Sequence, residues 1–134
     1  MRYISKQDLL DRFLFLTEKA ERTVSRTEKL ENYHDFISSS EQMDLFDATC
    51  MRLQVVGEML KQIDDITKGE LLKTHYPEIP WRKVIGMRNM ISHEYASIDP
   101  EIVFDIVKHN LIPLIEILKR VIDDIQTDRF DFIK

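Results

Sequence analysis

The sequence predicts an all-α protein, an antiparallel bundle of four to five helices built as a single domain over residues 1–134. The first observation is composition, because three glycines and four prolines are few for the turns that a sheet requires. The second is periodicity: apolar residues recur at intervals of three and four along most of the chain. The third is length, since 134 residues can bury one core without disulfides or metal ions.

Two long helices are expected in the first half. The first spans residues 5 to about 28 and opens with a capping box, Ser5 and Asp8. The pattern breaks in ENYHDFISSS, residues 31–40, and a second box of Ser39 and Gln42 opens the next helix. Gly57 inside it costs stability relative to alanine but lets another helix approach closely. The two apolar stripes are Leu9, Leu10, Phe13, Leu16, Ala20 and Val24, then Met43, Phe46, Cys50, Leu53, Val56, Leu60 and Ile63.

The middle of the chain is shaped by prolines. Thr67 and Glu70 predict a third helix cap before the short segment LLKTHY, residues 71–76. The stretch YPEIPW, residues 76–81, cannot lie inside a helix because its two prolines lack the amide donor. A helix is expected to start at Pro80 or Trp81, with Trp81 in the core, and to end soon after His93.

A final helix is predicted from Asp99 as cap and Pro100 as first residue to about residue 126. Pro113 lies inside it and should kink it, leaving the carbonyl of His109 without its donor. The apolar stripe of this helix consists of Val103, Val107, Leu111, Leu114, Leu118, Val121 and Ile125, widened by Ile102, Ile106 and Ile117.

Charge and cysteine content narrow the class of protein. The net charge of −5 argues against broad binding to a phosphate backbone. Residues 68–95, however, hold five basic and three acidic side chains, a net of +2 that leaves −7 for the rest of the chain. The lone Cys50 fits a reducing compartment, no apolar run is long enough for a membrane span, and the N-terminus lacks the apolar stretch of a signal peptide. A cytoplasmic location is therefore expected.

The stretch RNMISHEY, residues 88–95, is the strongest candidate site. Asn89 and His93 are four apart and share a helix face, whereas Arg88 and His93 lie about 140° apart around an ideal helix. The two can meet if Arg88 reaches around, if the helix frays, or if a second copy of the chain completes the site. The alternative is structural: Arg88 and Asn89 solvated, His93 partly buried, and Tyr95 packed at the helix terminus.

One part of the chain resembles the signature region of the HEPN superfamily, in its HepT-like branch. This part is residues 81–118, WRKVIGMRNMISHEYASIDPEIVFDIVKHNLIPLIEIL. Arg88, His93 and Tyr95 match the R-x4-H-x-Y motif of that branch, and Asn89 matches its polar residue after the arginine. Upstream, residues 76–81 match a Y-P-x-I-P-W element, and residues 57–58 match a G-E pair. Ala96, Ser97 and Phe104 depart mildly from the pattern, which affects the loop rather than the motif.

The resemblance implies a dimerising helical bundle and a metal-independent endoribonuclease that needs no cofactor. It implies a toxin whose antitoxin partner is a minimal nucleotidyltransferase, with adenylylation of the motif tyrosine, Tyr95, as the means of inactivation. Arg88, Asn89 and His93 would be the catalytic residues and RNA the substrate. The residues suit this chemistry, because histidine can accept or donate a proton near neutral pH and arginine can bind a phosphate.

Other functions are less well supported by the sequence. The main alternative is a non-catalytic helical module that binds a nucleotide or the partner, which the acidic net charge favours. His34, His75 and His109 are scattered, so the sequence predicts no metal site. Glu58 is expected to be solvated or paired with Lys61. The adjacent acidic pairs, residues 64–65 and 123–124, are expected on solvated helix surface.

Overall fold

The computed structural model describes residues 3–134, apart from the side chain of Tyr95, and the fold is all-α. In this part of the chain the only β pairing is an isolated bridge between Ile4 and Ile133, which joins the two ends. The helical elements are α1 (Lys6–Thr27), η1 (Tyr33–Ile37), α2 (Ser40–Ile66), α3 (Leu72–His75), α4 (Trp81–Glu94), η2 (Tyr95–Ser97), α5 (Pro100–Asp105), η3 (Ile106–Asn110) and α6 (Leu111–Gln126).

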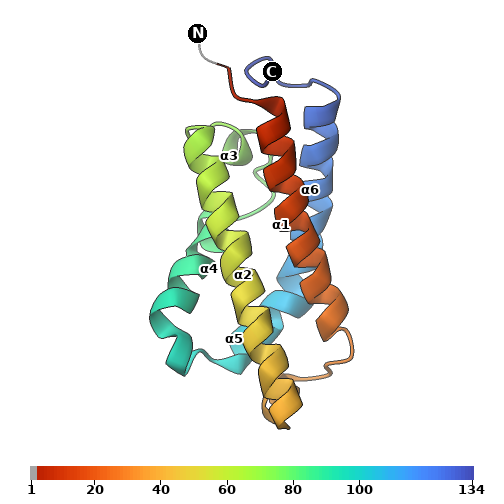
Figure 1. The fold of residues 1–134 in the computed structure, drawn as a ribbon, viewed down its shortest axis with the longest axis vertical. Coiled ribbons are helices and arrows are strands. Elements are labelled where there is room, and N and C mark those ends of the chain that lie inside the picture. Colours follow the sequence, from red (N-terminus) through yellow and green to blue (C-terminus); the bar gives the residue numbers. More distant parts are fainter. Residues whose placement is uncertain (1–2) are drawn as a thin grey trace.

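The long helices pack as antiparallel neighbours, as the sequence predicts. Helix α1 contacts both α2 and α6, and α2 contacts α4 on its other side. Figure 1 shows α1 and α4 running in one direction and α2 and α6 in the opposite direction. Helix α4, which carries the motif, therefore lies at the edge of the bundle, covered on one face by α2. Among residues 3–134, no helix is long and apolar enough to cross a membrane.

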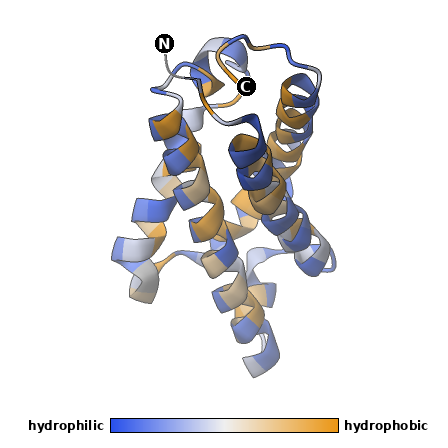
Figure 2. Cartoon of the chain, turned by 45° about the horizontal axis from the view of Figure 1, so that its top comes forward, coloured by the Kyte–Doolittle hydropathy of each residue, from blue (hydrophilic) through white to orange (hydrophobic). Residues whose placement is uncertain are grey.

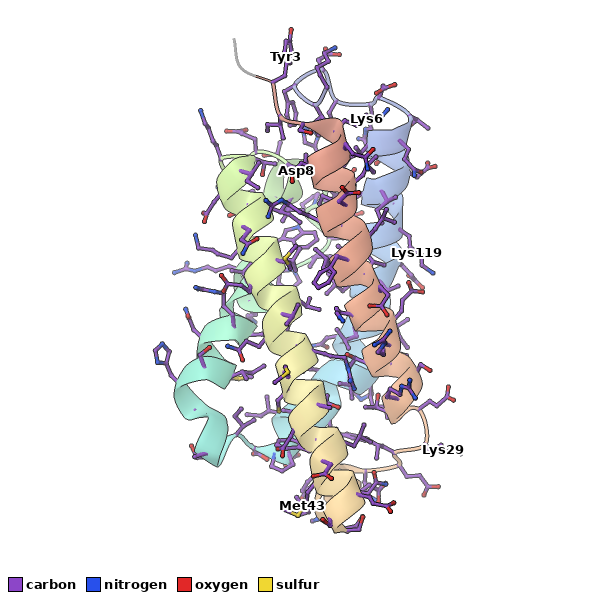
Figure 3. The ribbon with its side chains drawn as sticks, viewed as in Figure 1. Tyr3, Lys6, Asp8, Lys29, Met43 and Lys119 are labelled. Carbon is purple, nitrogen blue, oxygen red and sulfur yellow. The ribbon has the colours of Figure 1, made fainter. Side chains whose placement is uncertain are left out.

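The core follows the predicted apolar stripes. Figure 2 shows hydrophobic residues on the sides of the helices that face one another. Burial of these stripes is the main favourable contribution to folding. Two predicted positions are wrong. Met43 is 53% exposed, because it lies at the tip of α2 that extends past α1 (Figure 3), and Ile102, at the edge of the last stripe, is 46% exposed. Fully buried side chains from α1, η1, α2, α3, α4, α5 and α6 meet in the core, among them Phe13, Phe36, Leu53, Leu72, Ile91, Val103 and Leu111.

Three of the four predicted helix caps are confirmed. The Ser5 and Ser39 hydroxyls accept the amides of Asp8 and Gln42, and the Asp99 carboxylate accepts the amide of Glu101. Each bond satisfies an amide that the first turn of a helix leaves unpaired.

The predicted cap at Thr67 is wrong. Thr67 ends α2 rather than starting α3, and its hydroxyl donates to the carbonyl of Ile63. The next two residues, Lys68 and Gly69, have φ of 54° and 71°, so the chain reverses there. A left-handed pair after a helix is a termination signal, and glycine adopts it without strain. Helix α3 then begins without any side-chain cap.

The expected disturbance at Pro113 is found one turn earlier. Residues Ile106–Asn110 form a π-helical turn between α5 and α6, and the amide of Leu111 donates to the carbonyl of Ile106. Because Pro113 has no amide hydrogen, one backbone hydrogen bond of the α-helix cannot form at this position. The helix accommodates the missing bond with a wider, π-helical turn.

Candidate active site on helix α4

The start of α4 is fixed by the YPEIPW loop. The side chain of Trp81, the first residue of α4, is 5% exposed, and its indole Nε1–H donates to the carbonyl of Tyr76 at 2.7 Å. Tyr76 is fully buried, and its hydroxyl donates to the Asp124 carboxylate on α6 at 2.6 Å. The loop thus ties the beginning of α4 to the far end of α6.

Asp124 is an exception to the expectation that the acidic pairs are solvated. Its side chain is 17% exposed and accepts hydrogen bonds from Tyr76 and from Arg129, the latter at 2.7 Å. Burial by itself raises the pKa of the Asp124 carboxyl, but the hydrogen bonds from Tyr76 and Arg129 outweigh it, so the pKa is lowered overall. Burial, with the bond to this carboxylate, raises the pKa of the Tyr76 hydroxyl well above its usual range.

Helices α2 and α4 approach closely at Gly57. A Cβ built on Gly57 would lie 3.1 Å from the backbone nitrogen of Arg88 and 3.4 Å from the carbonyl oxygen of Ile85. The close approach expected of this glycine is therefore confirmed. One turn away, Gln54 donates to the hydroxyl of Ser92 at 2.6 Å, which fixes the register of the two helices.

Arg88 faces this interface. Its Nε–H donates to Glu58 at 2.5 Å, and its Nη1–H donates to the amide oxygen of Asn89 at 3.2 Å. The Arg88 side chain is 29% exposed, so the guanidinium is held from two sides while part of it faces solvent. The sequence predicts that Glu58 is solvated or paired with Lys61. It does not pair with Lys61, which pairs with Asp65 at 2.6 Å. The Glu58 side chain is half-exposed while it accepts from Arg88.

His93 lies in the last turn of α4, and its side chain is exposed. The backbone leaves helical geometry only at Glu94, where φ is −120° and ψ is 17°, so α4 does not fray before His93. Arg88 turns toward α2, and His93 lies about 140° further around the axis. Within one chain the structure therefore brings together Arg88, Asn89 and Glu58, and it does not bring His93 to Arg88. The side chain of Tyr95 lies outside the described part, and its backbone begins η2.

The comparisons with known proteins agree with the motif. The family model "Ribonuclease HepT-like" matches residues 16–121, which includes all of the α2–α4 interface and the motif. The chain belongs to the HepT-like ribonuclease family. This assignment confirms the predicted family and, at that level, the predicted endoribonuclease class. It leaves the individual roles of Arg88, Asn89, His93 and Tyr95 as predictions.

The HepT-like chain has curated relatives in two archaea. It is 26% identical to "Putative RNase MJ1380" of Methanocaldococcus jannaschii, over 81% of this chain and 91% of the relative. It is 30% identical to "Putative RNase MJ0127" of the same organism, over 72% of this chain and 84% of the relative. A shorter match, 31% identical over 48% of this chain and 54% of the relative, is to "Probable ribonuclease HepT" of Thermococcus cleftensis. No solved structure matches this chain.

Glu58 is the site residue that reasoning from the sequence missed. Its partner lies 30 positions away, so no local spacing reveals the contact. The available signal was Gly57. A glycine lets a second helix pack closely, and side chains of that second helix then contact the residue beside the glycine. In this HepT-like protein that next residue is Glu58, and the approaching side chain is Arg88.

Proposed function

We propose that this HepT-like protein is a metal-independent endoribonuclease and the toxin of a HEPN/nucleotidyltransferase toxin–antitoxin pair. Arg88, Asn89 and His93 would cleave RNA at a cleft between two subunits, and adenylylation of Tyr95 by the partner would inactivate the protein. The observation that carries this proposal is the Arg88 guanidinium, held by Glu58 and Asn89 with part of its surface open, on the same helix as an exposed imidazole.

The cleavage step uses only groups that the chain and RNA supply. A base removes the proton of a ribose 2′-hydroxyl, whose oxygen forms a bond to the adjacent phosphorus. The bond from phosphorus to the 5′-oxygen breaks, and an acid protonates that leaving oxygen. The products are a 2′,3′-cyclic phosphate and a 5′-hydroxyl. His93 would serve in proton transfer, and Arg88 would stabilise the negative charge that develops on the phosphoryl oxygens.

A two-fold dimer would resolve two difficulties of the single chain. One imidazole cannot act both as base and as acid on opposite sides of the phosphorus, and Arg88 and His93 of one chain face different directions. If the α4 helices of two copies meet across a two-fold axis, one cleft receives two copies of each residue. The exposure of His93 leaves it free for such a cleft.

Tyr95 supports a simple mode of inactivation. Adenylylation would transfer AMP from ATP to the tyrosine oxygen, with release of pyrophosphate and the hydroxyl proton. The attached phosphate would lie two residues from His93, and its negative charge would compete with RNA for Arg88. Incubation with the nucleotidyltransferase and ATP should add the mass of AMP to the protein but not to Tyr95→Phe. An unmodified wild-type protein beside an active partner would overturn this part of the proposal.

A nuclease assay tests the catalytic proposal. The purified protein should cleave RNA in the presence of EDTA and leave 2′,3′-cyclic phosphate ends, and a 2′-deoxy nucleotide at the scissile position should block cleavage. Arg88→Ala and His93→Ala should each lower kcat at least a hundredfold. Arg22→Ala and His34→Ala are matched controls, because both side chains are exposed and lie outside the motif. Wild-type rates in the His93→Ala protein would refute the proposal.

The non-catalytic alternative rests on the ion pair of Arg88. Because Glu58 already neutralises this guanidinium, Arg88 could serve to hold the α2–α4 face in shape for a bound nucleotide or partner. In that case purified protein would bind a nucleotide or the partner but would cleave no RNA. The same nuclease assay, run beside a binding titration with ATP, separates the two functions.

A further inference from the structure

A cleft outside the motif has the composition of a second anion-binding site. A cavity of about 700 Å³ lies between the end of α2, α3 and the start of α4. Four of the ten residues that line it are basic, namely Lys61, Lys73, Arg82 and Lys83, and one is acidic, Asp64. We call this cavity the basic cleft.

The charge of the basic cleft is largely uncompensated. Lys61 pairs with Asp65, but Lys73, Arg82 and Lys83 form no ion pair among the side chains that the structure describes. All three are exposed. In a chain with a net charge of −5, these cations form a local positive surface. Such a surface attracts a polyanion even when the whole protein is acidic.

Residues that line the basic cleft lie one helical turn from the proposed site residues on both α2 and α4. Ile85 lines the cleft and lies one helical turn before Arg88, and Lys61 lies one turn beyond Glu58 on α2. Arg82, Asn89 and His93 are separated by seven and four residues, which places them within about 40° of one another around the axis of α4. An extended strand laid along this stripe would contact all three.

The dimensions fit a strand with several phosphates. Arg82 and His93 are eleven residues apart, so they are separated by about 16 Å along the helix axis. A scissile phosphate at His93 would therefore be flanked by further phosphates toward Arg82 and Lys73 of the same chain. Apolar lining from Pro77, Ile79 and Pro80 offers surface for bases of a single strand.

We propose that the basic cleft binds the RNA backbone on one side of the scissile bond, with Arg82 and Lys73 contacting phosphates. This inference takes RNA as the substrate, as in the proposed function. An acidic surface of a partner protein could also be attracted to these cations. RNA is favoured because Arg82 both lines the cleft and lies on the stripe of α4 that holds Asn89 and His93.

The test compares binding and cleavage in a double variant. Lys73→Ala with Arg82→Ala removes two exposed cations, and Lys29→Ala with Lys119→Ala is the matched control. Figure 3 shows Lys29 and Lys119 on the side of the bundle away from α4. Binding is measured by fluorescence anisotropy with a 2′-O-methyl RNA of about twelve nucleotides, which cannot be cleaved by attack of the 2′-oxygen.

The double variant should bind this RNA about three- to tenfold more weakly than wild type. The slope of log K against log salt should fall by about 0.7 for each phosphate that the variant no longer neutralises. Its kcat/KM should fall on a long RNA and stay at the wild-type value on a dinucleoside monophosphate, which has only the scissile phosphate. The control variant should match wild type throughout.

Equal RNA binding and equal salt slopes in the two double variants would overturn the inference. So would unchanged RNA binding combined with weaker binding of the nucleotidyltransferase, which would assign the cleft to the partner protein. If wild type cleaves no RNA, the proposed function fails, but the binding measurement still decides whether the cleft contacts RNA.

Discussion

Arg88 donates its Nε–H to Glu58 at 2.5 Å, so a carboxylate from the neighbouring helix holds the arginine of the motif. The bond occupies the inner edge of the guanidinium and leaves the two terminal nitrogens for other partners. One of them contacts Asn89 at 3.2 Å. We therefore expect Glu58 to act as a positioning residue, which sets the direction of Arg88 and offsets part of its positive charge.

Substitution of Glu58 should separate these two effects. Glu58→Ala should lower kcat about tenfold, because Arg88 loses its fixed direction, while KM should not rise, because a negative charge has been removed near the substrate. Glu58→Gln keeps an acceptor for Arg88 and should retain more of kcat than the alanine variant. Steady-state kinetics measure both effects, and Glu116→Ala on α6 is the control for loss of an exposed carboxylate. A rise in KM without a fall in kcat would contradict the positioning role.

The two helical glycines of this chain near the motif should respond oppositely to alanine. At Gly57 the added methyl would meet the backbone nitrogen of Arg88 at 3.1 Å, and moving α4 should cost about 1–3 kcal/mol. Alanine gains about 1 kcal/mol in helix propensity, so Gly57→Ala should be destabilising overall or at best neutral. At Gly86 nothing lies within 4 Å, so Gly86→Ala should stabilise by about 0.5–1 kcal/mol.

Chemical denaturation measures both changes in the free energy of unfolding. Gly57→Ala should also lower nuclease activity, because the methyl presses on the residue that carries the guanidinium. Gly86→Ala should leave activity unchanged. Equal stabilisation by the two substitutions would show that α2 and α4 are not in close contact at Gly57.

Local patterns predicted most of this fold. The caps at Ser5, Ser39 and Asp99 and the start of α4 at Trp81 depend on residues within a few positions of each other, which the sequence displays directly. The cap expected at Thr67 is wrong because the same residue types can open one helix or close another. Whether Thr67 opens or closes a helix depends on the left-handed residues that follow it. Their backbone angles follow from the packing of α2 and α3.

The site was only partly predictable, because its spacing is local but its contacts are not. The spacing of Arg88, Asn89 and His93 is local, and the structure keeps the 140° separation that an ideal helix implies. The contacts of Arg88 with Glu58 and of Tyr76 with Asp124 join residues 30 and 48 positions apart. Such contacts depend on which helices become neighbours, and a single sequence does not state this.

Tyr76→Phe tests whether the YPEIPW loop anchors α4. It removes a hydroxyl that donates to a carboxylate at 2.6 Å, so the free energy of unfolding should fall by about 1.5–3 kcal/mol at neutral pH. Phenylalanine keeps the ring beneath Arg120, whose guanidinium carbon lies 5.3 Å from the ring centroid. Tyr3→Phe is the control, because that side chain is 53% exposed.

The loss of stability caused by Tyr76→Phe should become smaller as the pH falls. Folding lowers the pKa of Asp124 below its ordinary value of 3.8, so the stability that this carboxylate contributes is present above that value. It is lost as the pH falls through the lowered pKa, when the carboxylate takes up a proton. The stability difference between wild type and variant should therefore shrink below about pH 4. A difference that stays constant through acid would mean that the hydroxyl does not interact with charged Asp124.

Complementation tests whether the cleft is shared between subunits. Arg88 and His93 of one chain point about 140° apart, so a complete site is expected to combine residues of two chains. Arg88→Ala and His93→Ala proteins should each be inactive alone and regain measurable activity when mixed, because about half of freely exchanging dimers pair one of each. Differently tagged subunits report the exchange by co-purification. The mixed dimer holds one intact Arg88 and one intact His93, so its recovered activity should stay well below that of wild type. Exchange without any recovery of cleavage would show that this one pair is not enough, either because the cleft needs both imidazoles or because it takes Arg88 and His93 from the same chain.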